Sequence, residues 1–283
     1  MEIKRIGIVG AGTMGNGIAQ AFAGCGYEVT MTDISEAAVQ RGLKTIDGSL
    51  DRLVKKEKLT AEAKAATLAR VKTATDVAAV KGTDLIIEAA TENLDLKLKL
   101  FAQLSELAGD AILATNTSSI SVTRLAAATK IADRVIGMHF FNPVPMLQLI
   151  ELIRGLQTSD ATYAAVEAVA KKIGKTPVKV KNSPGFVVNR LLCPMMNEAV
   201  NVLAEGLATA EEIDIAMKLG TNQPMGPLAL CDLVGLDVEL AVMNVLYEGF
   251  KDPKYRPAPL LVEMVEAGYL GRKTGRGFFT YNK

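Results

Sequence analysis

Short apolar runs alternate with amphipathic stretches over the first two thirds of the chain. Runs typical of strands cover residues 3–9, 27–33, 71–74, 84–89, 111–115, 134–140 and 176–180. Between these runs, apolar residues recur at helical spacing, for example at Ile18, Ala19 and Phe22 and again over residues 94–107. Strands that alternate with helices in this way form βαβ units, so we predict a mostly parallel sheet covered by helices.

A change of pattern near residue 183 predicts a domain boundary. Residues 181–185 (KNSPG) have the composition of a linker, and Ser183 with Pro184 can also open a helix. Beyond them, apolar residues at helical spacing cover residues 188–203, 211–219, 228–249 and 259–267, and a strand pattern returns only at 278–281. We therefore predict an α/β domain over residues 1–183 and an all-helical domain over residues 184–283.

Length, composition and charge narrow the class of protein. The chain has 283 residues, 49% of them hydrophobic and 22% charged, and its net charge is +1. That length fits two globular domains, and the balanced charge gives no basic field that would favour nucleic acid as a partner. No apolar run reaches the ~18 residues of a transmembrane helix, which argues against a membrane protein. The N-terminus lacks the pattern of a secretory signal peptide, so we expect a cytoplasmic location.

Cysteine and histidine content restricts the chemistry further. Cys25, Cys193 and Cys231 are odd in number, far apart and set among apolar or small residues, which favours buried thiols over a disulfide framework. The chain contains one histidine. A zinc site built on several histidines is therefore excluded, no metal is predicted, and any imidazole chemistry falls on His139.

A glycine-rich turn joins the first strand pattern to the first helix pattern. The pattern G-x-G-x-x-G is formed by Gly10, Ala11, Gly12, Thr13, Met14 and Gly15. Glycines at these places allow a tight turn and a close approach of backbone amides to a pyrophosphate, and the helix N-terminus favours the phosphates. Such a turn is often only a turn, but Asp33 ends the second strand pattern, where a carboxylate can bind the adenosine ribose and repel a 2′-phosphate. We therefore predict a dinucleotide site that takes NAD in preference to NADP.

His139 lies near the end of a strand pattern, where the strands of such a sheet face the ligand crevice. Glu151 follows within the apolar run 147–153. A carboxylate in an apolar run needs a partner when it is buried, and a neighbouring imidazole would be one, so we predict a general acid–base pair. The alternatives are a core histidine with satisfied hydrogen bonds and a glutamate at a strand edge facing water.

Two further segments place polar side chains where a carbonyl-bearing ligand could bind. Asn116 and Ser118 belong to the run 116–119 (NTSS), which follows a buried strand pattern and is predicted to emerge at the same crevice. Such a run is also ordinary loop chemistry. Asn189 lies just inside the helix expected to start near Pro184, where asparagine is neither a cap nor a good helix former. A ligand contact and a solvated polar face remain the two interpretations of Asn189.

Six motifs occur in order along the chain, and together they resemble the short-chain 3-hydroxyacyl-CoA dehydrogenase family, most closely its bacterial 3-hydroxybutyryl-CoA dehydrogenases. The motifs are residues 10–15 (GAGTMG), 116–119 (NTSS), 139–145 (HFFNPVP), 183–190 (SPGFVVNR), 225–227 (MGP) and 271–275 (GRKTG). The resemblance implies a doubly wound Rossmann-type domain followed by an all-helical domain that mediates homodimer formation. It also implies reversible oxidation of an (S)-3-hydroxyacyl-CoA to the 3-ketoacyl-CoA by NAD. Butyrate, fatty-acid and polymer metabolism all stay open as settings for that reaction.

The resemblance also assigns roles to matching positions. His139 would be the general base, Glu151 its orienting partner, and Ser118 and Asn189 the ligands of the substrate oxygen. Asn142 would complete the site. We expect the cofactor-binding residues to be Gly10, Gly12, Thr13, Met14, Gly15, Asp33, Glu92, Lys97, Asn116 and Asn142.

The CoA part of such a substrate is anionic and needs cations. Residues 41–58 contain six basic and three acidic residues, and Arg52, Lys55 and Lys56 share one helical face. A solvated surface helix would look the same. The resemblance implies CoA contacts at Ser49 and Lys56, and we add Arg52 and Lys55 from the charge pattern.

Two rival functions differ from this interpretation. One is a protein that binds NAD without turnover, against which the presence of His139, Glu151, Ser118 and Asn189 argues. The other is a dehydrogenase of free 3-hydroxy acids, which would need a cation for the carboxylate in place of a surface patch for CoA.

Overall fold

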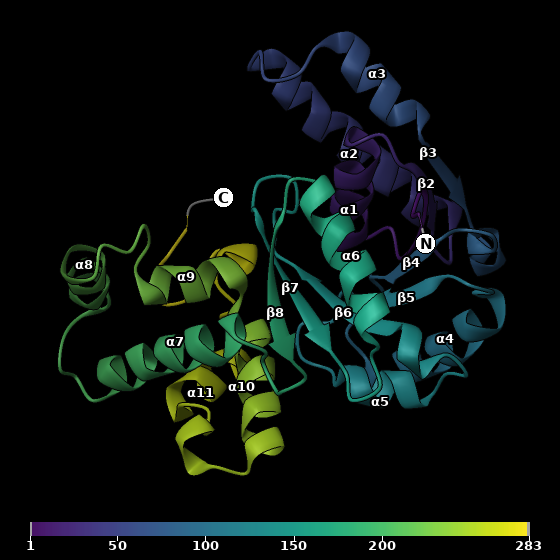
Figure 1. Cartoon of the computed structure of the whole chain (residues 1–283). Coiled ribbons are helices and arrows are strands. Elements are labelled where there is room, and N and C mark those ends of the chain that lie inside the picture. The colour runs from purple at the N-terminus through teal and green to yellow at the C-terminus, as the bar shows by residue number, and fades with distance from the viewer. Residues whose placement is uncertain (1, 282–283) are drawn as a thin grey trace. The chain divides into compact units, whose positions relative to one another are not determined.

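The chain divides into two compact units in a computed structural model that describes residues 2–281 (Figure 1). The first unit is Met1–Asn182 and the second is Ser183–Lys283. None of the helices in the described part of the chain is long and apolar enough to cross a membrane.

The first unit is built on one eight-stranded sheet with the strand order β3-β2-β1-β4-β5-β6-β7-β8. All neighbouring strands are parallel except β6 and β7, which are antiparallel. The strands are β1 (Arg5–Val9), β2 (Glu28–Thr32), β3 (Val71–Ala74), β4 (Leu85–Glu88), β5 (Ile112–Thr115), β6 (Val135–Phe140), β7 (Leu149–Arg154) and β8 (Thr176–Lys181). Because the order reverses at β1, the crevice expected for a ligand lies at the carboxyl ends of β1 and β4.

Helices cover both faces of this sheet, as the burial of every residue of β4 and β5 requires. The helices are α1 (Thr13–Gly24), α2 (Glu36–Lys55), α3 (Ala61–Ala69), α4 (Leu94–Leu107), α5 (Val122–Ala127) and α6 (Asp160–Lys172), with the 3-10 turns η1 (Val77–Val80) and η2 (Ala132–Arg134). Five of the α-helices begin at a side-chain cap in which Ser35, Thr60, Asn93, Ser121 or Ser159 accepts a backbone N–H three residues later. Such caps satisfy amides that the first helical turn leaves without a partner, so local sequence fixes where these helices start.

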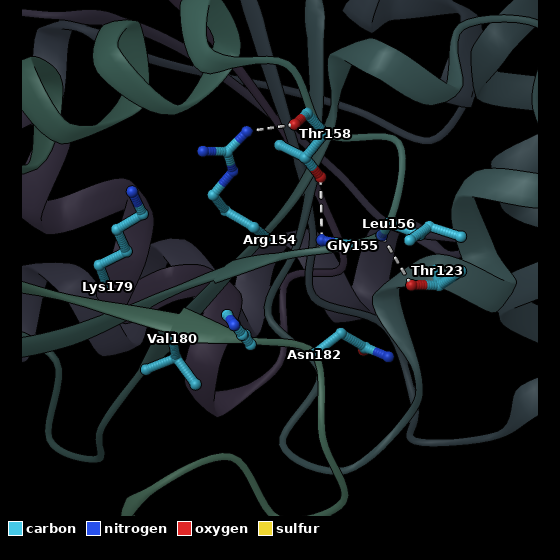
Figure 2. Close-up of a pocket in the computed structure, with 9 residues that line it drawn as sticks. Thr123, Arg154, Gly155, Leu156, Thr158, Lys179, Val180 and Asn182 are labelled. Carbon is cyan, nitrogen blue, oxygen red and sulfur yellow. Dashed lines mark hydrogen bonds between the residues drawn. The ribbon is translucent and has the colours of Figure 1, made fainter.

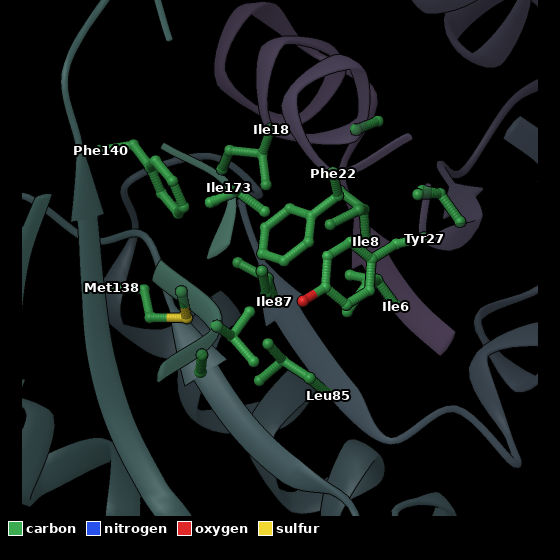
Figure 3. Close-up of a cluster of buried hydrophobic side chains, with 14 of the residues drawn as sticks. Ile6, Ile8, Ile18, Phe22, Tyr27, Leu85, Ile87, Met138, Phe140 and Ile173 are labelled. Atoms are coloured by element: carbon green, nitrogen blue, oxygen red, sulfur yellow. The ribbon is translucent and has the colours of Figure 1, made fainter. Parts of the chain in front are cut away.

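One face of the sheet forms the main core with α1, α2 and α6. Figure 3 shows Phe22 of α1 among side chains of β1, β4 and β6, with the Tyr27 and Phe140 rings close by. Strand residues alternate between the two faces, so Ile87 belongs to this core while Ile86, also fully buried, points to the opposite face. The apolar pattern therefore holds the carboxyl ends of the strands in fixed register.

The second unit is helical and has a core of its own. Its helices are α7 (Val188–Ala204), α8 (Ala210–Gly220), α9 (Pro227–Val234), α10 (Leu236–Phe250) and α11 (Pro259–Glu266), with the turns η3 (Pro253–Tyr255) and η4 (Arg272–Thr274). Two buried carboxylates organise it: Asp214 accepts the first amides of α9, and Asp232 accepts the amides of Phe278 and Phe279. A third, Glu239 of α10, is fully buried, and within residues 2–281 neither of its side-chain oxygens has an ordinary hydrogen-bond partner.

Several sequence predictions about elements are wrong in detail. The pattern 228–249 is two helices, because Gly235 adopts a φ of +106° that ends α9 and opens α10. Residues 278–281 do not form a strand, although Thr280 makes an isolated bridge to Arg276. Helix α7 begins at Val188 and not near Pro184, since residues 183–186 form a turn in which Phe186 has a positive φ. Of the three free cysteines, Cys25 is exposed, contrary to expectation.

Strand β7 was missed altogether. The run 147–153 was noted as apolar, but the strand Leu149–Arg154 that it forms was not predicted. Its pairing with β6 is what reverses the direction of the sheet there.

Candidate active site

The glycine turn leaves β1 and enters α1 with no space for side chains at two of its positions. Gly10 has a φ of +108°, and a Cβ there would lie 2.6 Å from the Ala89 carbonyl oxygen. A Cβ on Gly15 would lie 1.8 Å from the Gly10 oxygen. At Gly12 a Cβ would meet nothing within 4 Å, so the backbone is open there. Since Thr13 is the first residue of α1, the helix N-terminus faces this open backbone, as phosphate binding requires.

Asp33 follows β2 and is held in place by backbone amides. One carboxylate oxygen accepts from Ala11 N and the other from Ile34 N, both at 2.8 Å. Asp33 also lines a cavity of about 300 Å³ whose walls include Gly10, Gly12, Ile34, Val77, Leu96 and Leu100. Apolar walls beside a fixed carboxylate and a glycine turn fit the adenosine half of a dinucleotide.

Two loops at the carboxyl ends of β4 and β5 are tied together by Glu92. Its Oε1 accepts from Thr117 Oγ1 at 2.5 Å, from Ser118 N at 3.0 Å and from Ser119 Oγ at 3.0 Å. Partial burial opposes ionisation, but the Lys97 ammonium and these hydrogen bonds outweigh it and hold the pKa of Glu92 below its usual value. Glu92 is therefore a carboxylate at neutral pH, and it fixes the loop that contains Ser118.

Behind Glu92 lies a buried ion pair. The Lys97 ammonium is 2.5 Å from Oε1 of Glu88 and 3.4 Å from Oε2 of Glu92, and the Lys97 side chain is 1% exposed. Lys97 and Glu92 were predicted from the sequence to bind the cofactor, whereas Glu88 was not recognised as a site residue. An acidic residue inside a run of four buried strand positions was the available signal.

His139 and Glu151 form a second buried pair. They stand directly opposite each other in the antiparallel pairing of β6 and β7, and His139 Nδ1 lies 2.7 Å from Glu151 Oε2. Their side chains are 7% and 1% exposed, and the ring of Phe141 lies 4.4 Å from the imidazole centroid. A carboxylate at this distance accepts from Nδ1–H and so directs the chemistry of the ring to Nε2.

Asn116 connects the loop after β5 with the end of β6. Its side-chain oxygen accepts from Phe140 N at 3.0 Å, one residue after His139. The loop that contains Ser118 and the strand that contains His139 are therefore held together at the carboxyl edge of the sheet. Asn142 is exposed just beyond β6, and Asn189 is the second residue of α7 in the second unit.

The predicted CoA patch lies on the last turns of α2. Arg52, Lys55 and Lys56 are exposed, and Ser49 is half-buried one turn earlier. Lys64 of α3 forms ion pairs with both Asp47 and Asp51 of this helix and so adds one positive charge from outside it. The excess of positive charge at the end of α2 is therefore larger than the local sequence suggests.

Two family models match the chain. The model of the 3-hydroxyacyl-CoA dehydrogenase NAD binding domain matches residues 5–183, and the model of the C-terminal domain of the same enzymes matches residues 185–281. The chain belongs to the 3-hydroxyacyl-CoA dehydrogenase family. It is 53% identical to 3-hydroxybutyryl-CoA dehydrogenase of Clostridioides difficile over 99% of this chain and 100% of that one. It is 50% identical to the enzyme of the same name from Bradyrhizobium diazoefficiens over 99% of this chain and 96% of that one.

The match to one solved structure covers both units of this chain. The crystal structure of (S)-3-hydroxybutyryl-CoA dehydrogenase from Ralstonia eutropha matches with a TM-score of 0.97 at 65% identity, covering 100% of both chains. The predicted α/β class with a Rossmann-type first domain and a helical second part is confirmed, as is the resemblance to this family. The chain is an NAD-dependent dehydrogenase of this family.

The first unit has a second cavity, larger than the one beside Asp33 and distant from His139. It measures about 680 Å³ and is lined at the ends of β7 and β8 by Arg154, Lys179 and Asn182, among others (Figure 2). Because β7 is antiparallel to β6 and β8 is parallel to β7, the carboxyl ends of β7 and β8 lie beside the amino end of β6, away from His139. Figure 2 shows that the Thr158 and Thr123 hydroxyls accept hydrogen bonds from Gly155 N and Leu156 N at the rim of the cavity. These two hydroxyls therefore stabilise the loop. In the part of the chain that the structure describes, no group of three metal-binding side chains accompanies either cavity.

Proposed function

We propose that this enzyme interconverts (S)-3-hydroxybutyryl-CoA, or a related short-chain 3-hydroxyacyl-CoA, and acetoacetyl-CoA with NAD(H). The observation that supports it most is the His139–Glu151 pair, 2.7 Å apart at the same edge of the sheet as the glycine turn. Its relatives named 3-hydroxybutyryl-CoA dehydrogenase support the choice of substrate class.

His139 acts as the general base in alcohol oxidation. Its Nε2 accepts the proton of the substrate 3-hydroxyl, while Glu151 holds the ring through Nδ1 and stabilises the imidazolium that forms. Bound NAD would supply the acceptor for the hydride that leaves the carbon bearing this hydroxyl. Ser118 donates to the substrate oxygen, and the loop that presents it is fixed by Glu92. In the reductive direction the His139 imidazolium returns the proton.

The cofactor is held by the glycine turn and its surroundings. The open backbone at Gly12 and the first residues of α1, Thr13 and Met14, face the pyrophosphate. Asp33 accepts the hydroxyls of the adenosine ribose, and Glu92, Lys97, Asn116 and Asn142 complete the cofactor side. The fixed negative charge of Asp33 disfavours a 2′-phosphate, so NAD is preferred over NADP.

The CoA handle binds at the end of α2. Ser49 and Lys56 contact it, and Arg52 and Lys55 add charge that attracts its phosphates. Asn189 is proposed as a second ligand of the substrate oxygen on the basis of the matching family motif. The boundary near residue 183 is proposed to separate the NAD-binding domain from the helical substrate and dimerisation domain.

We also propose a cytoplasmic homodimer that forms through the helical domain. Large apolar side chains are exposed on that unit, among them Leu191, Leu207 and Leu219, which are 70%, 76% and 81% exposed. The three free cysteines fit a reducing compartment. Light scattering after size exclusion gives the mass of the assembly, and cell fractionation tests the location.

One assay separates the proposed function from its rivals. NADH oxidation is measured with acetoacetyl-CoA and with free acetoacetate. Turnover of the thioester alone supports the proposal, turnover of both at equal kcat/KM favours a free-acid dehydrogenase, and NADH binding without turnover favours a binding protein.

A further inference from the structure

Glu88, the last residue of β4, is a fully buried carboxylate that belongs to none of the six sequence motifs. Its Oε1 accepts from Lys97 Nζ at 2.5 Å and from Ala90 N at 2.7 Å, and its Oε2 accepts from Thr115 Oγ1 at 2.7 Å. A carboxylate with no exposure is stable only when it is paired and hydrogen-bonded, which these three donors provide. Both oxygens of Glu88 are therefore committed to neighbouring elements.

The contacts of Lys97 are unequal. Its ammonium lies 2.5 Å from Glu88, 3.2 Å from the Ala90 oxygen and 3.4 Å from Glu92. The contact with Glu88 anchors the ammonium on β4. The longer contact with Glu92 places this fixed positive charge beside the Glu92 carboxylate. The other oxygen of Glu92, Oε1, accepts hydrogen bonds from Thr117, Ser118 and Ser119 in the loop after β5.

Two chains of contacts run from Glu88 to this one loop. The first passes through Lys97 and Glu92 to Ser118 N. The second passes through the Thr115 hydroxyl, which donates to Glu88 and accepts from Thr117 N at 3.1 Å. The backbone adds a third tie, because Asn116 N donates to the Glu88 carbonyl oxygen at 2.7 Å. Glu88 is the residue at which all three begin.

We propose that Glu88 is a positioning residue for the dehydrogenase reaction: by fixing Lys97 and Thr115 it fixes the loop that presents Ser118 to the substrate oxygen. The inference rests on the proposed function, since that function gives Ser118 its role. With no exposed surface, Glu88 acts through these neighbours and not by touching the substrate. A displacement of about 1 Å in a residue that positions the substrate can cost on the order of 10²-fold in rate.

The main test is Glu88→Gln. The amide keeps the shape but loses the charge, so the Lys97 ammonium turns toward Glu92 and competes with Ser118 and Thr117 for that carboxylate. We expect kcat for acetoacetyl-CoA reduction, counted per NADH-binding site, to fall about 10- to 100-fold. KM for acetoacetyl-CoA should change less than about threefold, because the CoA handle binds at α2.

The control is Glu106→Gln, the same substitution on the helix that contains Lys97. Glu106 pairs with Lys130 at the surface, where both side chains are more than half exposed, and its loss should leave kcat and KM at wild-type values. Counting NADH sites by fluorescence titration separates positioning from a merely structural role. Loss of folded protein lowers the number of sites, but it leaves kcat per site unchanged.

The results of these variants distinguish failure of the inference about Glu88 from failure of the proposed function. A folded Glu88→Gln enzyme with kcat per site within threefold of wild type overturns the inference and leaves the proposed function standing. If Glu88→Gln fails to fold, Thr115→Val takes its place, since it breaks the second chain of contacts but leaves the Glu88–Lys97 ion pair intact. Thr115→Val should lower kcat per site at least threefold, and an unchanged value overturns the inference. Absence of turnover in the wild type overturns the proposed function and, with it, the role of Ser118 on which the inference depends.

Discussion

His139 Nδ1 lies 2.7 Å from Glu151 Oε2, and the two residues are direct cross-strand partners in the one antiparallel pair of the sheet. Direct partners project on the same face of a sheet, so the pairing register itself brings the side chains together. A shift of one residue in β7 would turn Glu151 to the other face. The acid–base pair is therefore a consequence of strand register, which the apolar residues on both sides of it maintain.

His139→Gln should abolish most turnover and leave NADH binding nearly intact, because the imidazole acts on the substrate proton. Positioned acid–base catalysis contributes roughly 10²- to 10⁴-fold, which sets the expected loss in kcat. Stopped-flow turnover of acetoacetyl-CoA and fluorescence titration with NADH measure the two effects. Turnover within threefold of wild type would remove His139 from the mechanism.

Glu151→Gln and Glu151→Ala should differ in severity. Glutamine can still accept from Nδ1–H, so it orients the ring but no longer supplies a counter-charge to the imidazolium. Alanine removes both effects and leaves the Nδ1–H of a buried ring without this acceptor. We expect kcat to fall from wild type to Glu151→Gln and further to Glu151→Ala, while the dissociation constant of NADH stays the same in all three proteins. Equal kcat in the two variants would mean that orientation by Glu151 contributes nothing.

Periodicity in the sequence was sufficient for most of the sheet. The runs at residues 71–74, 84–89, 111–115 and 134–140 became β3, β4, β5 and β6 with ends shifted by one residue at most. Strands β4, β5 and β6 are buried along their whole length, so they appear in the sequence as mainly apolar runs. Strand β7 was missed because Glu151 interrupts its apolar run, and the partner that allows that charge to be buried is twelve residues away in another strand.

Site residues were predictable to the extent that they follow a strand or a glycine turn. His139 and Glu151 could be paired because each violated its apolar surroundings, and the contact between them is present. Glu88 was not recognised, since its three partners come from a loop, a helix and a neighbouring strand that only the fold brings together. The break at Gly235 was missed for a related reason: a glycine within a helical pattern costs only about 1 kcal/mol, so the pattern alone does not require a break there.

Asp33→Ala should weaken NADH binding and narrow the preference over NADPH. The carboxylate is already held by Ala11 N and Ile34 N, so it is fixed before the ribose arrives. Loss of hydrogen bonds to a charged group should raise the NADH dissociation constant at least tenfold. Asp110→Ala, an exposed acid in the loop before β5, is the control and should change neither constant. A wild type that already uses NADPH better than NADH would contradict the assignment of Asp33.

Reversing charge at Lys55 and Lys56 to Glu should raise KM for acetoacetyl-CoA about three- to tenfold, because exposed contacts contribute up to ~1 kcal/mol each. The effect should shrink as salt is added, and a truncated pantetheine thioester without nucleotide phosphates should be nearly unaffected. Reversal at Lys81 and Lys99, two exposed lysines outside α2, changes the net charge equally and serves as the control. An equal rise in KM for acetoacetyl-CoA and for the truncated thioester would mean that the patch has a structural role and does not bind CoA.

Glu239 should make the stability of the protein depend on pH. Burial raises the pKa of Glu239 to about 8, and the neighbouring Cys193 thiol offsets this only in part. Burial also raises the pKa of the Cys193 and Cys231 thiols, so both stay neutral over the range concerned. Glu239 is therefore protonated in the folded protein at neutral pH, whereas in the unfolded chain it ionises near its ordinary value of 4.5.

The sign of the effect follows from the protons bound in each state. Between these two pKa values the folded state binds one more proton than the unfolded state, so the free energy of unfolding falls as pH rises. The slope is at most about 1.4 kcal/mol per pH unit, and it ends near pH 8, where the folded carboxyl also ionises. Glu239→Gln keeps the shape but cannot ionise, so the variant should gain stability relative to wild type steadily from pH 5 to pH 8.

Urea unfolding followed by circular dichroism at several pH values measures this difference, in which titration of all other groups cancels. Glu263→Gln, at an exposed position of α11, is the matched control and should give the same difference from wild type at every pH. A difference between Glu239→Gln and wild type that does not vary with pH would mean that Glu239 is ionised in the folded protein. In that case a donor must reach its carboxylate, since a charge buried to this extent is not stable alone.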